Sequence, residues 1–331
     1  MRCTVVGAGA WGTALADLLV RNGHEVKLWA YEEDVVDSIN GRHENARFLA
    51  GHQLATGLEA INDVEEAVDD AELVTLATPS HVLRLITRRA VKALPEAATL
   101  VVATKGIEKS TLCLMTEVIE QEAPAATVVA LSGPSFATEV ISRQPTAVVV
   151  ASEDEEAAEL TQRVFSSPYF RAYTHTDVIG VELGGALKNV MAVATGIADG
   201  LGLGFNARAA LVTRGLAEMT RLGVALGAEQ STFAGLAGLG DLVLTCTGTL
   251  SRNRTVGVEL GKGRQLDEVL RSRETVAEGV TAAQSARELA IREGVEMPIV
   301  DAVNRVLFEG QPARRAIGEL MSRELRAEVD R

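Results

Sequence analysis

The chain is poor in cysteine, in positive charge and in long apolar runs. Its three cysteines, Cys3, Cys113 and Cys246, are odd in number and lack metal-site spacing, which favours a reducing compartment. Lys and Arg total 32 against 45 Asp and Glu, a net charge of −13 that excludes a chain-wide basic surface for nucleic acid or anionic lipid. Because no charge-free apolar run reaches about 18 residues and no signal peptide precedes the first predicted strand, we expect a soluble, cytoplasmic protein without stable membrane insertion.

Histidine and lysine are also scarce. The five histidines form no i, i+4 pair and have no cysteine nearby, so we expect no metal site. Only six of the 32 basic residues are lysines, at positions 27, 92, 105, 109, 188 and 262. Arg keeps its proton near neutral pH whereas Lys can be tuned to release it, so a Lys in apolar surroundings invites a chemical explanation.

What is present is an ordinary globular composition, 47% apolar and 23% charged, at a length that suits two domains. Short β-branched runs alternate with helical stretches up to about residue 177, which predicts βαβ units and a mostly parallel sheet. The predicted strands are residues 4–6, 26–29, 73–77, 100–103, 128–131, 147–151 and 170–175. Helical periodicity then dominates, with helix starts expected at Pro298, Pro312 and Thr281. We therefore predict an α/β fold with a Rossmann-type N-terminal domain, 1–178, and an all-α C-terminal domain, 179–331.

Two conspicuous segments have simple structural interpretations. The acidic run 153–156 follows Ser152, and Ser152 with Glu155 predicts a capping box at a helix start. The glycine-rich segment 196–204 follows a predicted helix, so we interpret it as an interhelical loop.

The segment 4–16 reads as strand, glycine turn and helix. Gly7 allows the tight turn, Gly9 lets the backbone approach a pyrophosphate, and Gly12 lets helix and strand pack closely. The alternative is a tightened turn that binds nothing. No Arg follows the second strand in residues 30–34, which locally favours NAD over NADP unless a basic residue comes from elsewhere.

Lys188 lies in the middle of segment 178–197, which is apolar nearly all round and predicts a buried helix. Its neighbours at three and four residues are mostly small, which leaves room for a ligand or another backbone. Burying an unpaired ammonium is costly. Two interpretations stay open, an ion pair with a carboxylate such as Asp241, or a catalytic lysine that donates and accepts a proton.

Further candidate cationic and polar residues occur before and after this segment in the sequence. Lys105 ends a buried strand, where α/β sheets bind ligands. Arg252 could clamp a phosphate, with Ser251 and Asn253 orienting hydroxyls, although a solvated surface turn is the alternative. A nucleotide fold, a buried lysine and a phosphate cluster together indicate hydride transfer on a small phosphorylated ketone or alcohol.

Six segments in order give the chain a family resemblance. They are residues 7–16, 105–108, 131–137, 182–190, 238–247 with 251–254, and 276–279. In these segments the sequence resembles the bacterial NAD(P)-dependent sn-glycerol-3-phosphate dehydrogenases. The resemblance implies reversible reduction of dihydroxyacetone phosphate to sn-glycerol 3-phosphate, which supplies glycerophospholipid synthesis, and a homodimer.

The same resemblance implies roles for individual residues. Lys188 is the implied proton donor and acceptor. The implied substrate-binding residues are Lys105, Gly133, Ser135, Asp241, Ser251, Arg252 and Asn253. The implied NAD or NADP contacts are Gly7, Gly9, Ala10, Trp11, Gly12, Tyr31, Lys105, Ala137, Arg252, Val276 and Glu278.

The chain also departs from the family pattern. Ala10 stands where Ser is frequent, and Tyr31 where Arg or His is common, which puts NADP use in doubt. Ala50 and Gly248 replace a common Pro and Ser. The alternatives are a related dehydrogenase of 3-hydroxy acids or phosphogluconate, and a cofactor-sensing protein without catalysis.

Overall fold

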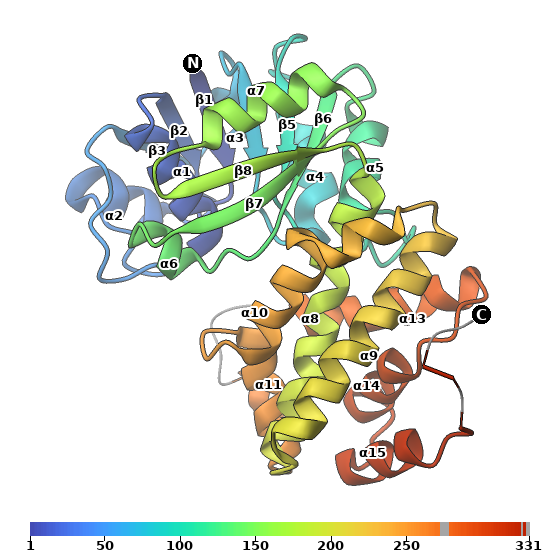
Figure 1. Cartoon of the computed structure of the whole chain (residues 1–331). Helices are drawn as coiled ribbons and strands as arrows, with labels where there is room; N and C mark the ends of the chain where they lie inside the picture. Colours follow the sequence, from blue (N-terminus) through green and yellow to red (C-terminus); the bar gives the residue numbers. More distant parts are fainter. Residues whose placement is uncertain (272–277, 326, 329–331) are drawn as a thin grey trace. The chain divides into compact units, whose positions relative to one another are not determined.

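A computed structural model describes residues 1–271, 278–325, 327 and 328, and it contains two compact units (Figure 1). The first combines Met1–Ala186 with Gly223–Asp241, and the second combines Leu187–Leu222 with the chain from Leu242 onward. The chain therefore leaves the first unit within helix α8 (Val178–Gly200) and later returns to it. The predicted domain boundary at 178/179 coincides with the start of α8 and stays a prediction.

The first unit is built on an eight-stranded sheet with the order β3-β2-β1-β4-β5-β6-β7-β8. All neighbouring strands are parallel except β6 and β7, which confirms the predicted mostly parallel sheet. The strands are β1 (Arg2–Val6), β2 (Glu25–Trp29), β3 (Leu58–Ile61), β4 (Leu73–Leu76), β5 (Thr99–Val102), β6 (Thr127–Ser132), β7 (Thr146–Ala151) and β8 (Phe170–His175). Sequence patterning missed β3, a four-residue edge strand whose Leu-Glu-Ala-Ile sequence lacks a β-branched run.

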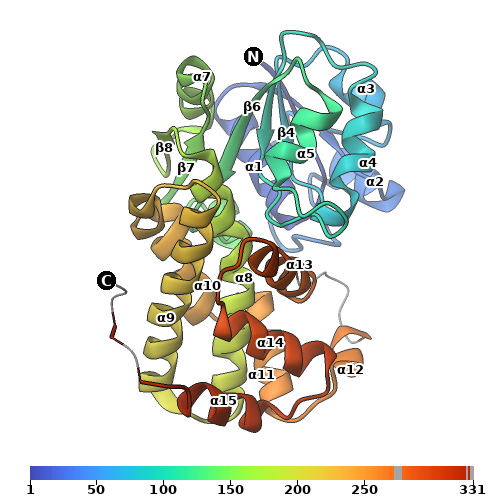
Figure 2. The same cartoon turned by 90° about the vertical axis from the view of Figure 1, so that its right-hand side faces the viewer.

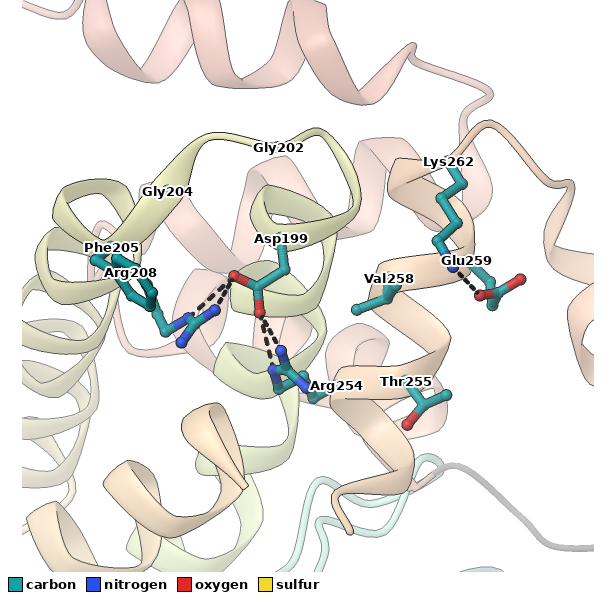
Figure 3. A pocket seen from close by; sticks show the side chains of 10 residues that line it. All are labelled: Asp199, Gly202, Gly204, Phe205, Arg208, Arg254, Thr255, Val258, Glu259 and Lys262. Carbon is teal, nitrogen blue, oxygen red and sulfur yellow. Dashed lines mark hydrogen bonds and ion pairs between the residues drawn. The ribbon is translucent and has the colours of Figure 1, made fainter. Parts of the chain in front are cut away.

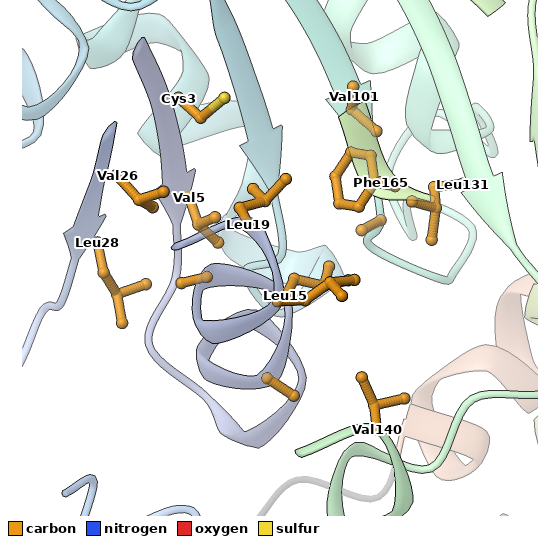
Figure 4. Packing of buried hydrophobic residues seen from close by; sticks show 14 of the residues in the cluster. Cys3, Val5, Leu15, Leu19, Val26, Leu28, Val101, Leu131, Val140 and Phe165 are labelled. Atoms are coloured by element: carbon orange, nitrogen blue, oxygen red, sulfur yellow. The ribbon is translucent and has the colours of Figure 1, made fainter. Parts of the chain in front are cut away.

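Helices cover both faces of this sheet. The helices are α1 (Ala10–Arg21), α2 (Glu33–Arg42), α3 (Val64–Val68), α4 (Ser80–Ala90), α5 (Met115–Glu122), α6 (Ala137–Ile141) and α7 (Glu155–Phe165). One core cluster joins the sheet to α1, α2, α6 and α7, and in it Phe165 of α7 lies beside Val101 and Leu131 (Figure 4). A second cluster joins the other face to α3, α4 and α5. Strands covered on both faces are largely apolar, which is why β4 reads Leu-Val-Thr-Leu with every residue buried.

Two short turns complete the first unit. They are the 3₁₀ turn η1 (Gln230–Ala234) and the π turn η2 (Leu236–Gly240). Ala237 of η2 and Val181 of α8 share a small core with Ala130, Val149 and Ala151 of the sheet. The part of the sheet at β6 and β7 is thus covered by a segment more than 80 residues further along the chain.

The second unit consists of helices (Figure 2). They are the end of α8, α9 (Gly204–Ala225), α10 (Asp241–Thr247), α11 (Arg252–Gly261), α12 (Leu266–Arg271), α13 (Glu278–Arg292), α14 (Pro298–Phe308) and α15 (Ala313–Met321). A Cβ added to Gly196 or Gly257 would lie 2.1 or 2.2 Å from a backbone oxygen of the facing helix, so α8 and α11 touch through their backbones. The predicted interhelical loop over 196–204 is confirmed only for residues 201–203, because α8 continues to Gly200 and α9 begins at Gly204. Gly196 and Gly200 lie in α8 and serve helix contact.

Some predicted helix starts hold and others do not. Pro298 occupies the first position of α14, and Pro312 is the residue that precedes α15. Thr281 lies inside α13 and does not cap it. The capping box at Ser152 is also wrong, because Asp154 caps α7 by accepting from the Ala157 N–H, while the Ser152 hydroxyl donates to Val128 O. The Asp154 carboxylate, one residue before the helix, offers the shorter reach to the open amides.

Helix α8 is long and apolar enough to cross a membrane by length and composition. However, 89% of its most apolar window is buried inside the protein, as in the core helix of a globular fold.

Candidate active site

The turn after β1 forms an open cradle of backbone. Gly7 has φ of 118°, and a Cβ there would lie 2.9 Å from the Ala77 carbonyl carbon and oxygen. A Cβ on Gly12 would lie 1.9 Å from Gly7 O, whereas one on Gly9 would meet nothing within 4 Å. Gly9 precedes the first residue of α1, so the open space lies where the unpaired N–H groups and the positive end of the helix dipole gather. This cradle fits a dinucleotide pyrophosphate.

Two buried polar atoms near the cradle have no hydrogen-bond partner within the described part of the chain. They are Nε1 of Trp11, in the first turn of α1, and Oγ1 of Thr78, two residues after β4. A buried donor without a partner is costly, and a bound ligand can supply the missing bond. Thr78 was not among the predicted contacts, although it follows the carboxyl end of a buried strand, as Lys105 does.

The segment after β2 carries no cation of its own, but one approaches it. Tyr31 is 74% exposed and lies edge-on to Trp29, with ring centroids 6.5 Å apart. Arg47 Nη1 reaches Asp34 Oδ1 at 3.3 Å and lies over the ring of Phe48. A basic residue from elsewhere therefore stands beside the segment in which the sequence has none.

Lys105 and Asp241 form the central ion pair of the first unit. The Lys105 Nζ donates to Asp241 Oδ2 at 2.7 Å and to the Gly133 carbonyl at 3.1 Å. Asp241 is fully buried and the Lys105 side chain is only 14% exposed, so the ion pair is largely shielded from solvent. Gly133 has φ of 135°, and Ser135 Oγ donates to the same Gly133 carbonyl. Three predicted substrate residues besides Lys105 thus meet around one ammonium group.

The first turns of α8 are in close contact with Lys105 and its neighbours. A Cβ on Gly185 would lie 2.6 Å from Ser132 Oγ and 3.3 Å from Cδ of Lys105, and one on Gly184 would lie 2.3 Å from Ala237 O. The small residues before Lys188 therefore make room for backbone and for the stem of Lys105. Ser132 Oγ is buried and, among the described residues, has no hydrogen-bond partner, so it is a further candidate contact that the sequence analysis missed.

Lys188 lies in the second unit, on the part of α8 that follows Ala186, and its residue is only 8% exposed. The buried helix that the sequence predicts around it is present. Its catalytic role remains a prediction.

The remaining predicted residues fall on α11 and α13. Ser251 caps α11 and its Oγ accepts from the Arg254 N–H, while Arg252 is exposed at the first position of the helix. The buried Asn253 amide donates to Asn189 Oδ1 at 2.9 Å and accepts from the Gly279 N–H at 2.9 Å, so it ties α11 to the neighbour of Lys188. Glu278 is half-buried at the start of α13, Ala137 begins α6, and Val276 lies outside the described residues.

A carboxylate that the sequence analysis left without a role lies on the same helix as Lys188. Glu182 is buried and accepts from the N–H and the hydroxyl of Thr116 at the start of α5. Burial raises the pKa of Glu182 to about 7. Nothing in the local sequence shows this partner, which lies 66 residues away.

The described residues contain no group of three or more His, Cys, Asp or Glu that could hold a metal ion. What this part of the chain offers is a phosphate cradle, an anchored ammonium and a buried lysine.

Comparison with known proteins identifies the family of the chain. Residues 2–158 match the family model described as NAD-dependent glycerol-3-phosphate dehydrogenase N-terminus, and residues 177–318 match the corresponding C-terminus. The chain is 55% identical to glycerol-3-phosphate dehydrogenase (NAD(P)+) of Geobacter metallireducens over 98% of each chain. It is also 55% identical to the enzyme of that name from Geobacter sulfurreducens, over 99% of this chain and 98% of the relative. The crystal structure of glycerol-3-phosphate dehydrogenase from Coxiella burnetii is 39% identical, with a TM-score of 0.94 over 97% of this chain and 99% of that one.

Proposed function

Because this chain belongs to the NAD-dependent glycerol-3-phosphate dehydrogenase family, and so is an NAD(P)-dependent oxidoreductase, we propose that it reduces dihydroxyacetone phosphate reversibly to sn-glycerol 3-phosphate with Lys188 as proton donor. The observation that carries the proposal is the anchored Lys105 ammonium after the carboxyl end of β5, two strands from β1 and its glycine cradle in the same sheet. We further propose that the product feeds glycerophospholipid synthesis in the cytoplasm and that the enzyme is a homodimer.

Lys105 is suited to receive the phosphate of the substrate. Asp241 and Gly133 O hold its Nζ in place, so little side-chain entropy is lost when an anion arrives. Lys105 thus offers a positioned N–H donor to an anion in a chain whose net charge is −13. Arg252, exposed at the start of α11, supplies the second cation and can bind two phosphate oxygens at once.

Lys188 is suited to serve the carbonyl oxygen of the substrate. The reduced nicotinamide supplies the hydride when bound, so the protein needs one proton and a positive charge beside the developing alkoxide. An ammonium on a buried helix provides both, and low exposure strengthens its field by excluding water. In the reverse direction the neutral amine accepts the hydroxyl proton.

The cofactor is NAD or NADP, and the residues present fit either one. Gly7, Gly9 and Gly12 form the cradle, with Ala10 and Trp11 in the first turn of α1 and Ala137 at the start of α6. Tyr31 offers no charge to a 2′-phosphate, but Arg47 stands next to Asp34. We expect Arg47→Ala to lower the rate with NADPH relative to NADH by about threefold or less, because Arg47 is an exposed cation. Parallel assays with the two cofactors measure this ratio, and an unchanged ratio would mean that Arg47 does not reach the cofactor.

The decisive experiment replaces Lys188. We expect Lys188→Ala to lower turnover by about 10²–10⁴-fold, since that is the range for general acid–base catalysis, while cofactor affinity stays normal. Oxidation of NADH or NADPH by dihydroxyacetone phosphate, followed by loss of nicotinamide absorbance, gives the rate, and fluorescence titration gives the affinity. Lys109→Ala, a change at an exposed lysine, is the matched control. Near-normal turnover of Lys188→Ala would show that Lys188 is not the proton donor.

A further inference from the structure

We propose that the second unit holds a separate binding pocket for a phosphate monoester with an apolar body, built around Arg208, Arg254 and Phe205. A cavity of about 600 Å³ lies between the end of α8, the start of α9 and α11 (Figure 3). Small-molecule sites typically have volumes of about 300–1,000 Å³. None of the lining residues belongs to the set predicted for substrate or cofactor, so this proposal does not rest on the proposed function.

The charges in this pocket do not balance. Arg208 donates from Nε and Nη2 to Asp199 Oδ1 at 3.0 and 2.6 Å, while Arg254 places Nε and Nη2 at 2.9 and 2.6 Å from Asp199 Oδ2. One carboxylate thus neutralises two guanidinium groups only in part, and one positive charge remains. The three side chains are between 10% and 22% exposed, so solvent screens this charge only partly.

Unused donors accompany the surplus charge. Among the described residues, Nη1 of neither arginine has a hydrogen-bond partner. A planar guanidinium with free N–H groups matches the oxygens of a phosphate better than any other side chain does. On the facing wall Glu259 is paired with Lys262 at 2.9 Å and with Arg264, which lies outside the lining, at 3.1 Å. This wall therefore adds no net negative charge. A pocket with this balance attracts anions, although the whole chain is acidic.

The mouth of the pocket is apolar, which selects the kind of anion. Phe205 is 81% exposed, and its ring lies 5.3 Å from the guanidinium carbon of Arg208. Val258 lines the opposite side (Figure 3). A phosphate that binds the arginines can place an apolar or aromatic body on the Phe205 ring, whereas inorganic phosphate cannot use that surface. The ligand class is therefore an organic phosphate monoester.

Calorimetric titration of the full chain with phenyl phosphate and with inorganic phosphate tests the proposal. Because the proposed active site also takes phosphate, we expect two binding events in the wild type, one of which Lys105→Ala removes. Arg208→Gln leaves Asp199 balanced by Arg254 alone, so it should weaken the other event about tenfold or more for both ligands. Arg214→Gln changes an arginine of the same helix outside the pocket and should leave both events unchanged.

Phe205→Ala distinguishes the contribution of the apolar body of the ligand from that of its phosphate. This exposed residue can be truncated without opening the core, and we expect phenyl phosphate to bind several-fold more weakly while inorganic phosphate binds as before. A single binding event that Lys105→Ala abolishes would overturn the proposal, as would normal binding by both Arg208→Gln and Phe205→Ala. A third outcome would also overturn the proposal: the wild type shows no second phosphate-binding event, and light scattering shows that Phe205→Ala changes the molecular mass of the particle. That outcome would identify the pocket as an interface between copies of the chain. Failure of the proposed function would appear separately, as absent turnover with the second event intact.

Discussion

Two sets of glycines, one in each compact unit, serve different physical purposes. In the first unit Gly7 and Gly133 have φ of 118° and 135°, angles that side chains rarely adopt, and each follows a strand where the chain must turn. In the second unit Gly196, Gly200, Gly257 and Gly261 lie inside helices with ordinary angles and bring α8 and α11 into backbone contact. Gly7 and Gly133 thus give the chain conformational freedom at turns, whereas these four helical glycines allow close approach of two helices. A glycine is therefore evidence for a ligand site only together with its local geometry.

The largest expected effect comes from the glycine cradle. Gly12→Ala would place a methyl group on Gly7 O, so we expect a loss of about 3 kcal/mol in stability, as for an overpacked core, together with loss of cofactor binding. Thermal unfolding and cofactor titration measure the two effects.

Gly9→Ala is the matched control for Gly12→Ala. The added methyl group meets no protein atom, so stability should stay normal while cofactor affinity falls, because the space belongs to the ligand. If Gly9→Ala bound cofactor normally, the turn would be a tightened turn and no cradle.

The next effect concerns a buried glutamate at a helix start, a feature that occurs in both units. Glu218 of the second unit accepts from the Ile299 and Val300 N–H groups at the start of α14, as Glu182 does from Thr116 at the start of α5. Burial raises the pKa of each carboxyl from 4.5 to about 7. The folded state therefore keeps protons that the unfolded state releases, so stability from these groups is full below pH 4.5 and is lost as the pH rises through about 7.

Replacement of each glutamate measures its share of this loss. The upper bound is about 3 kcal/mol per group. We expect Glu182→Gln and Glu218→Gln each to remove part of the decline, as measured by urea unfolding at several pH values relative to the wild type. If either variant kept the full decline, that glutamate would not titrate in this range and the two units would differ here as well.

A smaller effect is expected where helices touch. Gly257→Ala would bring a methyl group to 2.2 Å from Val193 O, so α8 and α11 must separate, and we expect a loss of about 2 kcal/mol. Gly318→Ala on α15 is the control, since no atom lies within 4 Å of the added Cβ and φ is not positive. It should stabilise the protein by up to about 1 kcal/mol through helix propensity. Equal effects of the two substitutions would remove the distinction between contact glycines and ordinary helical glycines.

The same contrast explains what could be predicted from the sequence. The cradle is a local pattern of strand, turn and helix, so Gly7, Gly9 and Gly12 can be interpreted from neighbouring residues. Gly196 and Gly200 look like helix breakers locally, and only their contact with Gly257 and Gly261, about 60 residues away, shows why the helix tolerates them. Strand β3 was missed for a related reason, since a four-residue edge strand is defined by its pairing with β2.

The candidate site divides in the same way. Lys105 was found because it ends a buried strand, and the rule that found it also applies to Thr78 and Ser132, which were overlooked. The pairing of Lys105 with Asp241 joins residues 136 positions apart and has no local signal. The shared carboxylate of Asp199 likewise depends on three helices meeting.

The return of the chain to the first unit has a consequence for the order of synthesis. A nascent chain that has emerged only as far as Ala186 has all eight strands, but it lacks Asp241 for Lys105 and Ala237 for Gly184. The segment Gly223–Asp241, which supplies these two residues, is translated after α8 and most of α9. The first unit therefore cannot be completed until this segment has been synthesised. The ion pair that we propose for substrate binding therefore forms only after this interval, long after the glycine turn that follows β1 has been translated.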